Sequence, residues 1–108
     1  MAAMLQVTAT VPTETRQAFD HWYQTEHLPD AQKAFGVKTA FRGWDTVDLT
    51  KHHAFYLFDS IEQANQVLTG DALQTLIADF DRVWQSQVSR QRSIINITQD
   101  LTVKPIQS

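Results

Sequence analysis

Residues 19–30 constrain the fold most, because they place large ring side chains on one helical stripe and then meet a proline. Phe19, Trp22, Tyr23 and His27 recur at helical spacing, so they share one face of a helix. Aromatic residues at this spacing are typical of a core, and the histidine adds a titratable ring at the edge of that core. We therefore expect a pocket where this stripe ends.

The composition is that of one ordinary globular domain. The chain has 108 residues, of which 43% are hydrophobic and 19% charged, enough for a single core that would gain stability by burial against a second subunit. We expect one domain over residues 1–108. No segment is apolar for long enough to cross a membrane, and the start lacks the basic segment and apolar run of a secretory signal. A cytoplasmic protein is expected.

Residue types exclude several classes of site. The chain has no cysteine, which excludes disulfides, thiolate nucleophiles and cysteine-held metal centres. The net charge of -3 offers no general attraction to the phosphates of a nucleic acid. His52 and His53 are expected in a turn, and they make a poor metal site because neighbouring residues of a strand point in opposite directions and no third ligand is in view. We expect no metal, no cofactor and no nucleic-acid partner.

Local patterns set the expected order of elements. Thr13, Ser60 and Asp71 are expected to cap helices, and Ser60 with Gln63 forms a capping box. The first of these helices extends to about Leu28. Period-two alternation and β-forming residues predict four strands, at residues 4–11, 37–47, 54–58 and 90–101.

Prolines, glycines and a polar stretch predict the interruptions. Leu28 precedes Pro29, and a residue before proline is disfavoured in a helix, so the long helix should break or kink there. One short helical turn should then end at Gly36 in a left-handed conformation. Residues 48–52 are polar enough for a turn, and Gly43 marks a bulge or a close backbone approach.

The order strand, helix, strand, strand, helix pair, strand is that of a ferredoxin-like βαββαβ fold. This α+β architecture has a four-stranded antiparallel sheet with helices on one face. The strands at 54–58 and 90–101 nevertheless carry apolar residues on both faces, so the second sheet face needs a cover. Two sheets packed about a two-fold axis would supply it. We expect a homodimer through the sheet faces; a monomer with a solvated sheet is the alternative.

Two segments carry a short signature, Trp22-Tyr23-Gln24-Thr25-Glu26-His27-Leu28-Pro29 and, opening a strand, Phe35-Gly36-Val37. Together they resemble the tyrosine, histidine-leucine-proline and glycine-valine signature of the dimeric α/β-barrel superfamily, nearest to its EthD-like branch. The resemblance covers most of the chain in element order. It implies two ferredoxin-like protomers packed sheet to sheet as a dimeric α/β barrel, with a ligand pocket between each sheet and its helices.

The resemblance implies several activities. Members of the superfamily include cofactor-independent monooxygenases of aromatic polyketides, polyketide cyclases, lactone isomerases and haem-handling enzymes, besides proteins of unknown activity. Because one fold can host many reactions, the resemblance constrains the fold more closely than the activity. His27 matches the motif histidine, which often faces the pocket.

His27 and Tyr23 are the candidate catalytic residues. An imidazole titrates near pH ~6.5 and can give or take a proton at cellular pH. The alternative is a histidine that favours the helix C-terminal dipole and bonds a carbonyl. Tyr23, one turn earlier on the same face, would bind a substrate oxygen or share a proton; otherwise it is a core residue with a satisfied hydroxyl.

Five further residues are candidates for substrate binding. Trp22 and Trp84, on separate helices, would form aromatic walls for a flat apolar ligand, with core packing as the alternative. Phe41, Arg42 and Tyr56 lie in strands, and the register decides whether each reaches the pocket. Arg42 would stabilise an enolate or grip a carboxylate; otherwise it is a solvated strand charge.

Arg90 and Arg92 lie two residues apart in a strand and so point to one face. They form either an anion clamp at the sheet edge or dimer interface, or ordinary ion pairs with carboxylates such as Asp79 or Asp81.

These residues lead to two hypotheses for function. The first is a small cofactor-independent enzyme, of monooxygenase, cyclase or isomerase type, that acts on an aromatic or polyketide-like molecule with His27 as general acid or base. The second is a non-catalytic dimeric protein of the same fold that binds a small apolar ligand or is mainly structural. A haem-handling role would require His27 as an axial or polarising ligand in a large cavity.

Overall fold

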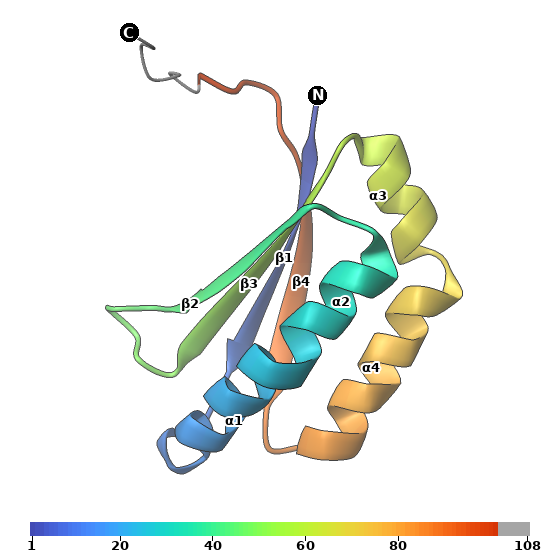
Figure 1. Ribbon diagram of the computed structural model, residues 1–108. Helices are drawn as coiled ribbons and strands as arrows, with labels where there is room; N and C mark the ends of the chain where they lie inside the picture. The colour runs from blue at the N-terminus through green and yellow to red at the C-terminus, as the bar shows by residue number, and fades with distance from the viewer. Residues whose placement is uncertain (102–108) are drawn as a thin grey trace, which may run out of the picture.

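The computed structural model describes residues 1–101, which form an antiparallel sheet with the helices on one of its faces (Figure 1). The four strands stand in the order β2-β3-β1-β4. They are β1 (Ala3–Thr10), β2 (Thr39–Trp44), β3 (Lys51–Phe58) and β4 (Ser89–Asn96). The helical elements are η1 (Thr13–Thr15), α1 (Arg16–Trp22), η2 (Tyr23–His27), α2 (Leu28–Phe35), α3 (Ile61–Leu68) and α4 (Asp71–Trp84). This order confirms the ferredoxin-like α+β fold.

The register of the central strand decides which residues face the helices. β1 pairs antiparallel with β3 and β4, so that Leu5 lies opposite Tyr56 and Ile94. Side chains alternate between the faces of a sheet. Leu5 and Tyr56 are therefore buried beneath the helices, whereas Gln6 and its partner Phe55 lie on the other face.

β2 is shorter than the expected strand over 37–47. The carboxylate of Asp45 accepts hydrogen bonds from the backbone N–H groups of Val47 and Asp48, at 2.8 and 3.0 Å, and so starts a turn directly after Trp44. Gly43 pairs in regular register with its partner in β3, so the expected bulge is absent from this pairing.

β3 is longer than expected and begins at Lys51. His52 and His53 thus belong to the strand and not to a turn. They point to opposite faces, with His52 buried under the helices and His53 on the other side. β4 ends at Asn96, short of the expected 101, although the N–H of Ile97 still bonds the carbonyl of Ala2.

Of the break or kink expected at Pro29, the break does not occur. α1 continues through the π-helical turn η2 into α2, and the N–H of Leu28 bonds the carbonyl of Tyr23, five residues earlier. A proline ring crowds the carbonyl four residues before it, and a wider turn accommodates the ring without ending the helix. The π-helical turn carries both Tyr23 and His27. The left-handed stop at Gly36, with φ 68°, is confirmed.

Only one of the three expected caps is made by its side chain. Ser60 accepts a hydrogen bond from the N–H of Gln63 at 3.1 Å and opens α3, as expected. Thr13 instead begins the 3-10 turn η1, and Gly70 takes the N-cap position of α4 with Asp71 inside the first turn. Asp71 still favours the helix dipole there.

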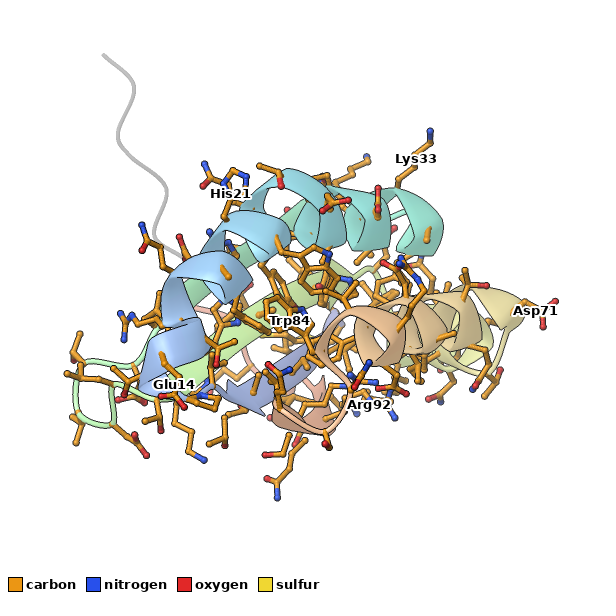
Figure 2. The ribbon with its side chains drawn as sticks, turned by 90° about the horizontal axis from the view of Figure 1, so that it is seen from below. Glu14, His21, Lys33, Asp71, Trp84 and Arg92 are labelled. Carbon is orange, nitrogen blue, oxygen red and sulfur yellow. The ribbon has the colours of Figure 1, made fainter. Side chains whose placement is uncertain are left out.

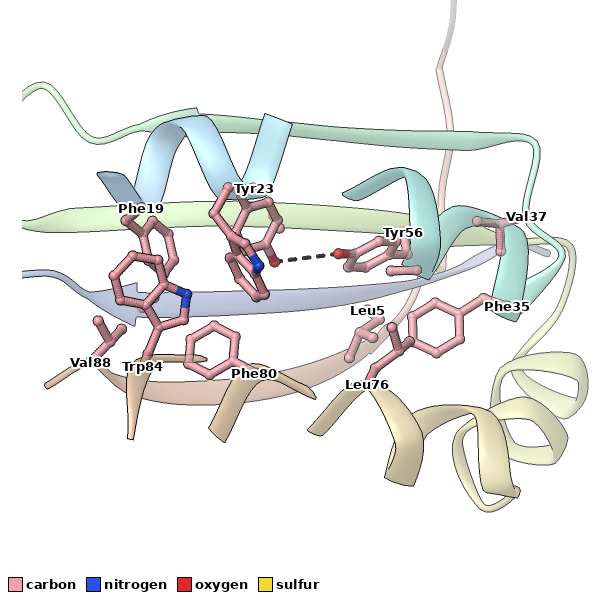
Figure 3. Close-up of a cluster of buried hydrophobic side chains, with 14 of the residues drawn as sticks. Leu5, Phe19, Tyr23, Phe35, Val37, Tyr56, Leu76, Phe80, Trp84 and Val88 are labelled. Atoms are coloured by element: carbon pink, nitrogen blue, oxygen red, sulfur yellow. Dashed lines mark hydrogen bonds between the residues drawn. The ribbon is translucent and has the colours of Figure 1, made fainter. Parts of the chain in front are cut away.

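Aromatic rings fill the space between the sheet and the helices (Figure 3). The ring of Phe19 is fully buried and lies 5.2 Å from that of Trp84 and 5.4 Å from that of Tyr23. Tilted and edge-to-face pairs of this kind add to the free energy gained from burial. The ring stripe expected from the sequence is therefore the centre of this core.

None of the helices in residues 1–101 covers the opposite sheet face (Figure 1). Phe41 and Phe55 stack there with ring centroids 4.9 Å apart, and Phe41 is 46% exposed. Ile95 on β4 is also exposed on this face. We call the apolar group formed by Phe41, Phe55, Leu57 and Ile95 the outer patch.

Among the described residues no helix is long and apolar enough to cross a membrane.

Candidate functional site

A small cavity lies between the sheet and the helices η2, α2 and α4. Its walls are mostly apolar and include Leu5, Phe35, Leu76 and Phe80, which Figure 3 shows around two tyrosines. The open space is about 30 Å³, room for one or two water molecules. The polar side chains that line the cavity are those of Tyr23, His27, Tyr56, Arg90 and Arg92.

His27 is buried, with 8% of its surface exposed. Its ring stacks on the indole of Trp22 at 4.6 Å and 21°, and meets the rings of Tyr23 and Phe80 edge-on. Its Nδ1 is buried without a hydrogen-bond partner among residues 1–101. Burial lowers the pKa of His27 to about 4, an effect that the charge of Asp79 partly offsets. At neutral pH the ring is therefore an uncharged imidazole.

Tyr23 and Tyr56 both line the cavity and contact each other. Their hydroxyl groups form a hydrogen bond of 3.4 Å, drawn as the dashed line in Figure 3. Both side chains are 2% exposed, and burial raises the pKa of each, that of Tyr23 to about 12. Both hydroxyls stay protonated, so two O–H groups share one bond and one O–H remains free to donate to a ligand oxygen.

Arg90 and Arg92 lie at the β4 side of the cavity. Arg90 pairs with Asp81 at 3.2 Å, and its guanidinium carbon lies 3.9 Å from the centre of the Phe80 ring. The expected ion pair with a carboxylate is thus confirmed for Arg90. Arg92 is exposed and makes no hydrogen bond or ion pair within residues 1–101.

Arg42 belongs to a separate polar network. Its guanidinium lies 2.8 Å from the carboxylate of Asp20 and 3.2 Å from Nε2 of His52. Asp20 also accepts from the indole N–H of Trp44 at 2.8 Å, and the bonds from Arg42 and Trp44 lower its pKa. His52 is 1% exposed, and burial lowers its pKa to about 3. The ring of His52 packs 4.5 Å from that of Tyr23, so this network supports the cavity from behind.

The structure brings together three of the seven candidates at the cavity itself. His27, Tyr23 and Tyr56 line it. The other four lie elsewhere. Trp22 and Trp84 are core rings, and Trp22 stacks on His27. Arg42 is held by Asp20. Phe41 belongs to the outer patch, because its position in β2 faces away from the helices.

His52 is a buried residue that the sequence interpretation placed in a turn. The alternation of side chains along β3 could have predicted its burial. His52 points to the same face as Ala54, Tyr56 and Phe58, which all face the helices. No group of three or more histidine, aspartate or glutamate side chains within residues 1–101 is arranged to hold a metal ion.

No family model and no curated protein matches the sequence. Solved structures match over nearly the whole chain. An EthD family protein from Bacillus halodurans matches with a TM-score of 0.66 and 17% identity, covering 86% of this chain and 97% of that one. A protein from Deinococcus radiodurans named after the antibiotic biosynthesis monooxygenases matches with a TM-score of 0.70 and 8% identity, over 95% and 99%.

A third match is a variant of SnoaB, a cofactor-independent oxygenase from Streptomyces nogalater. Its TM-score is 0.62 at 9% identity, covering 93% of this chain and 96% of that one. At these identities the likeness concerns the fold. The chain therefore has a ferredoxin-like fold, which it shares with EthD family and antibiotic biosynthesis monooxygenase-like structures.

Proposed function

We propose that the chain is a small enzyme that acts without a cofactor on an aromatic or polyketide-like small molecule, with His27 as general acid or base. The observation that carries the proposal is the buried, unpartnered Nδ1 of His27 in the same cavity as the Tyr23 and Tyr56 hydroxyls. A buried polar atom without a partner is rare and calls for an explanation. A substrate group that bonds this nitrogen supplies one.

The surroundings of His27 suit proton transfer. An uncharged imidazole is ready to accept a proton from an acidic C–H or O–H group. The indole face of Trp22 then stabilises the imidazolium, and the free tyrosine O–H stabilises an oxygen that becomes negative. The names of the fold neighbours, which include a cofactor-independent oxygenase, support this class of reaction.

The size of the cavity favours a second candidate, a non-catalytic ligand-binding or structural protein. Pockets for small organic molecules usually hold about 300–1,000 Å³, whereas this cavity has about 30 Å³. On this alternative His27 is a core residue. On the leading proposal a substrate has to displace side chains. Leu73 and Ile77 line the cavity from α4 and are only half-buried, so they are the side chains we expect to move.

The test starts with native mass spectrometry of freshly purified protein, which reports a retained small molecule and the assembly together. Turnover is then followed by oxygen uptake and absorbance with 1,8-dihydroxyanthrone and with hydroxylated naphthoquinones. If a substrate is found, His27→Ala should lower kcat/KM by about 100-fold or more, while His21→Gln, on the exposed side of α1, keeps the rate. An unchanged kcat/KM in His27→Ala disproves the role of His27. If the wild type and His27→Ala retain the same amount of ligand and neither shows turnover, the second candidate is favoured.

We also propose that the protein is a cytoplasmic homodimer joined through the outer patch. Apolar side chains on a sheet face without helices gain free energy when a second sheet covers them. In sedimentation experiments at micromolar concentration the protein should be dimeric, and Phe41→Glu should shift it towards the monomer with an unchanged circular dichroism spectrum. A monomeric wild-type protein contradicts this assembly.

A further inference from the structure

The cavity is positively charged at one end. Arg90 and Arg92 both point from β4 towards the helices and line it. None of the described residues that line the cavity is acidic. The whole chain carries a net charge of -3 and Asp81 neutralises Arg90, but no carboxylate within residues 1–101 pairs with Arg92. A negatively charged group is thus favoured on the β4 side of the cavity.

The two arginines differ in what they already bind. Arg90 has the carboxylate of Asp81 and the ring of Phe80 as partners, while Arg92 has no partner within residues 1–101. Burial, together with the charge of Arg92, lowers the pKa of Arg90. An anion near both guanidinium groups relieves their repulsion, and the planar fork of Arg92 matches a carboxylate in geometry.

The other polar side chains that line the cavity are uncharged and suit a neutral oxygen of a ligand. One tyrosine O–H of the Tyr23 and Tyr56 pair is free to donate, and Nδ1 of His27 lacks a partner. The rest of the cavity lining consists of rings and aliphatic side chains, among them Phe80 and Leu76. A ligand that satisfies all of these groups has a negatively charged group, an apolar body and a second oxygen.

We propose that this site binds a small planar acid, whose carboxylate or equivalent oxyanion lies against Arg92 and Arg90. A second oxygen of the ligand lies beside the Tyr23 and Tyr56 hydroxyls and Nδ1 of His27. The inference rests on the proposed function, because it names the substrate class of the same cavity. Arg92 is the anchor at the mouth, where α4 faces β4 (Figure 2).

The test compares acids with amides of the same shape. Binding of 6-hydroxy-2-naphthoate and its amide, and of 2-naphthoate and 2-naphthamide, which lack the second oxygen, is measured by calorimetry at low ionic strength, and the imidazole resonances of His27 report whether the probe is in the cavity. The acids should bind about tenfold or more tightly than the amides, since a charge-assisted hydrogen bond is lost in each amide. Added salt should weaken only the acids.

Variants at the mouth separate the anchor from general charge. Arg92→Gln should weaken the acids about tenfold and change the amides less than twofold, and Arg92→Lys should fall between the two. Arg82→Gln removes a charge from the exposed side of α4, and this variant should bind the acids with the affinity of the wild type. Because Arg92 is exposed, its variants should fold normally.

The outcomes separate this inference from the proposed function. If acids and amides bind equally and both shift the His27 resonances, the preference for an acid is wrong, while the pocket and the proposed function stand. If the acids bind but Arg92→Gln binds them unchanged, the anchor is wrong. If no probe shifts the His27 resonances at millimolar concentration, both the acid preference and the ligand pocket fail.

Discussion

Acid should unfold this protein in a pH range set by its buried histidines, and His27→Gln should remove a defined part of that effect. Burial holds the pKa of His27 at about 4 in the folded protein, below the ordinary value of 6.5. Between these two values the unfolded chain binds a proton that the folded protein does not. The stability that His27 contributes is therefore fully present above pH 6.5 and is lost as the pH falls towards 4.

The magnitude follows from the interval between the two pKa values. At about 1.4 kcal/mol per pH unit, the fall from 6.5 to about 4 corresponds to about 3 kcal/mol, a large part of the stability of a domain of this size. His52, with a folded pKa of about 3, adds a second loss over the same range. The carboxyl groups of Asp20, Asp45 and Asp48 have lowered pKa values, so their contributions are lost only below their ordinary value of 3.8.

The assay is urea unfolding, followed by circular dichroism at pH 7.0, 5.5 and 4.5 and at one protein concentration, since assembly would change the apparent stability. From pH 7.0 to 4.5 the unfolding free energy of the wild type should fall by about 2 kcal/mol more than that of His27→Gln. His21→Gln is the matched control, because His21 is exposed on the outside of the same helix (Figure 2), and its profile should follow the wild type. Parallel profiles for His27→Gln and the wild type would refute the reasoning.

Three further changes test the fold and the cavity. Asp20→Ala removes the acceptor of Arg42 and Trp44 and should lower the unfolding free energy by about 1–3 kcal/mol; a urea midpoint equal to that of the wild type would show that this network adds no stability. Ser60→Ala removes the cap of α3 and should cost about 1 kcal/mol in the same assay, with Thr69→Ala at the other end of α3 as a comparison that should cost less. Leu76→Ala enlarges the cavity from α4 and should cost about 2–5 kcal/mol while it improves the binding of 2-naphthoate measured by calorimetry; tighter binding at no cost in stability would mean that Leu76 is not packed as described.

Local patterns predicted the elements well where a single physical signal acted. The alternation of β1 and the capping residue Ser60 were read correctly, because side-chain periodicity and a cap depend on neighbouring residues only. A break at Pro29, one of the two outcomes expected there, does not occur, for a related reason. The rule for proline is local, whereas the helix packs along the sheet over its whole length, and the π-helical turn lets it continue.

The candidate site was predictable on its helix and much less so on its strands. His27 and Tyr23 share a helical stripe that the sequence shows directly, so both were found. Phe41 and Tyr56 depended on register, and a shift of one residue exchanges the faces of a strand. Pairing of Phe41 with Phe55 turned Phe41 away from the helices, while Tyr56 faces Tyr23.

The sequence by itself determined the element order, the fold class and the ring stripe that ends in His27, because these follow from hydrophobic period and residue type along the chain. The tertiary structure alone decided that Arg42 is held by Asp20 and that Arg92 is left without a partner in residues 1–101. It also decided that His27 lines the same cavity as Tyr23 and Tyr56. These are contacts between segments far apart in the sequence. Burial, which shifts the pKa of His27, exists only once those segments are packed together.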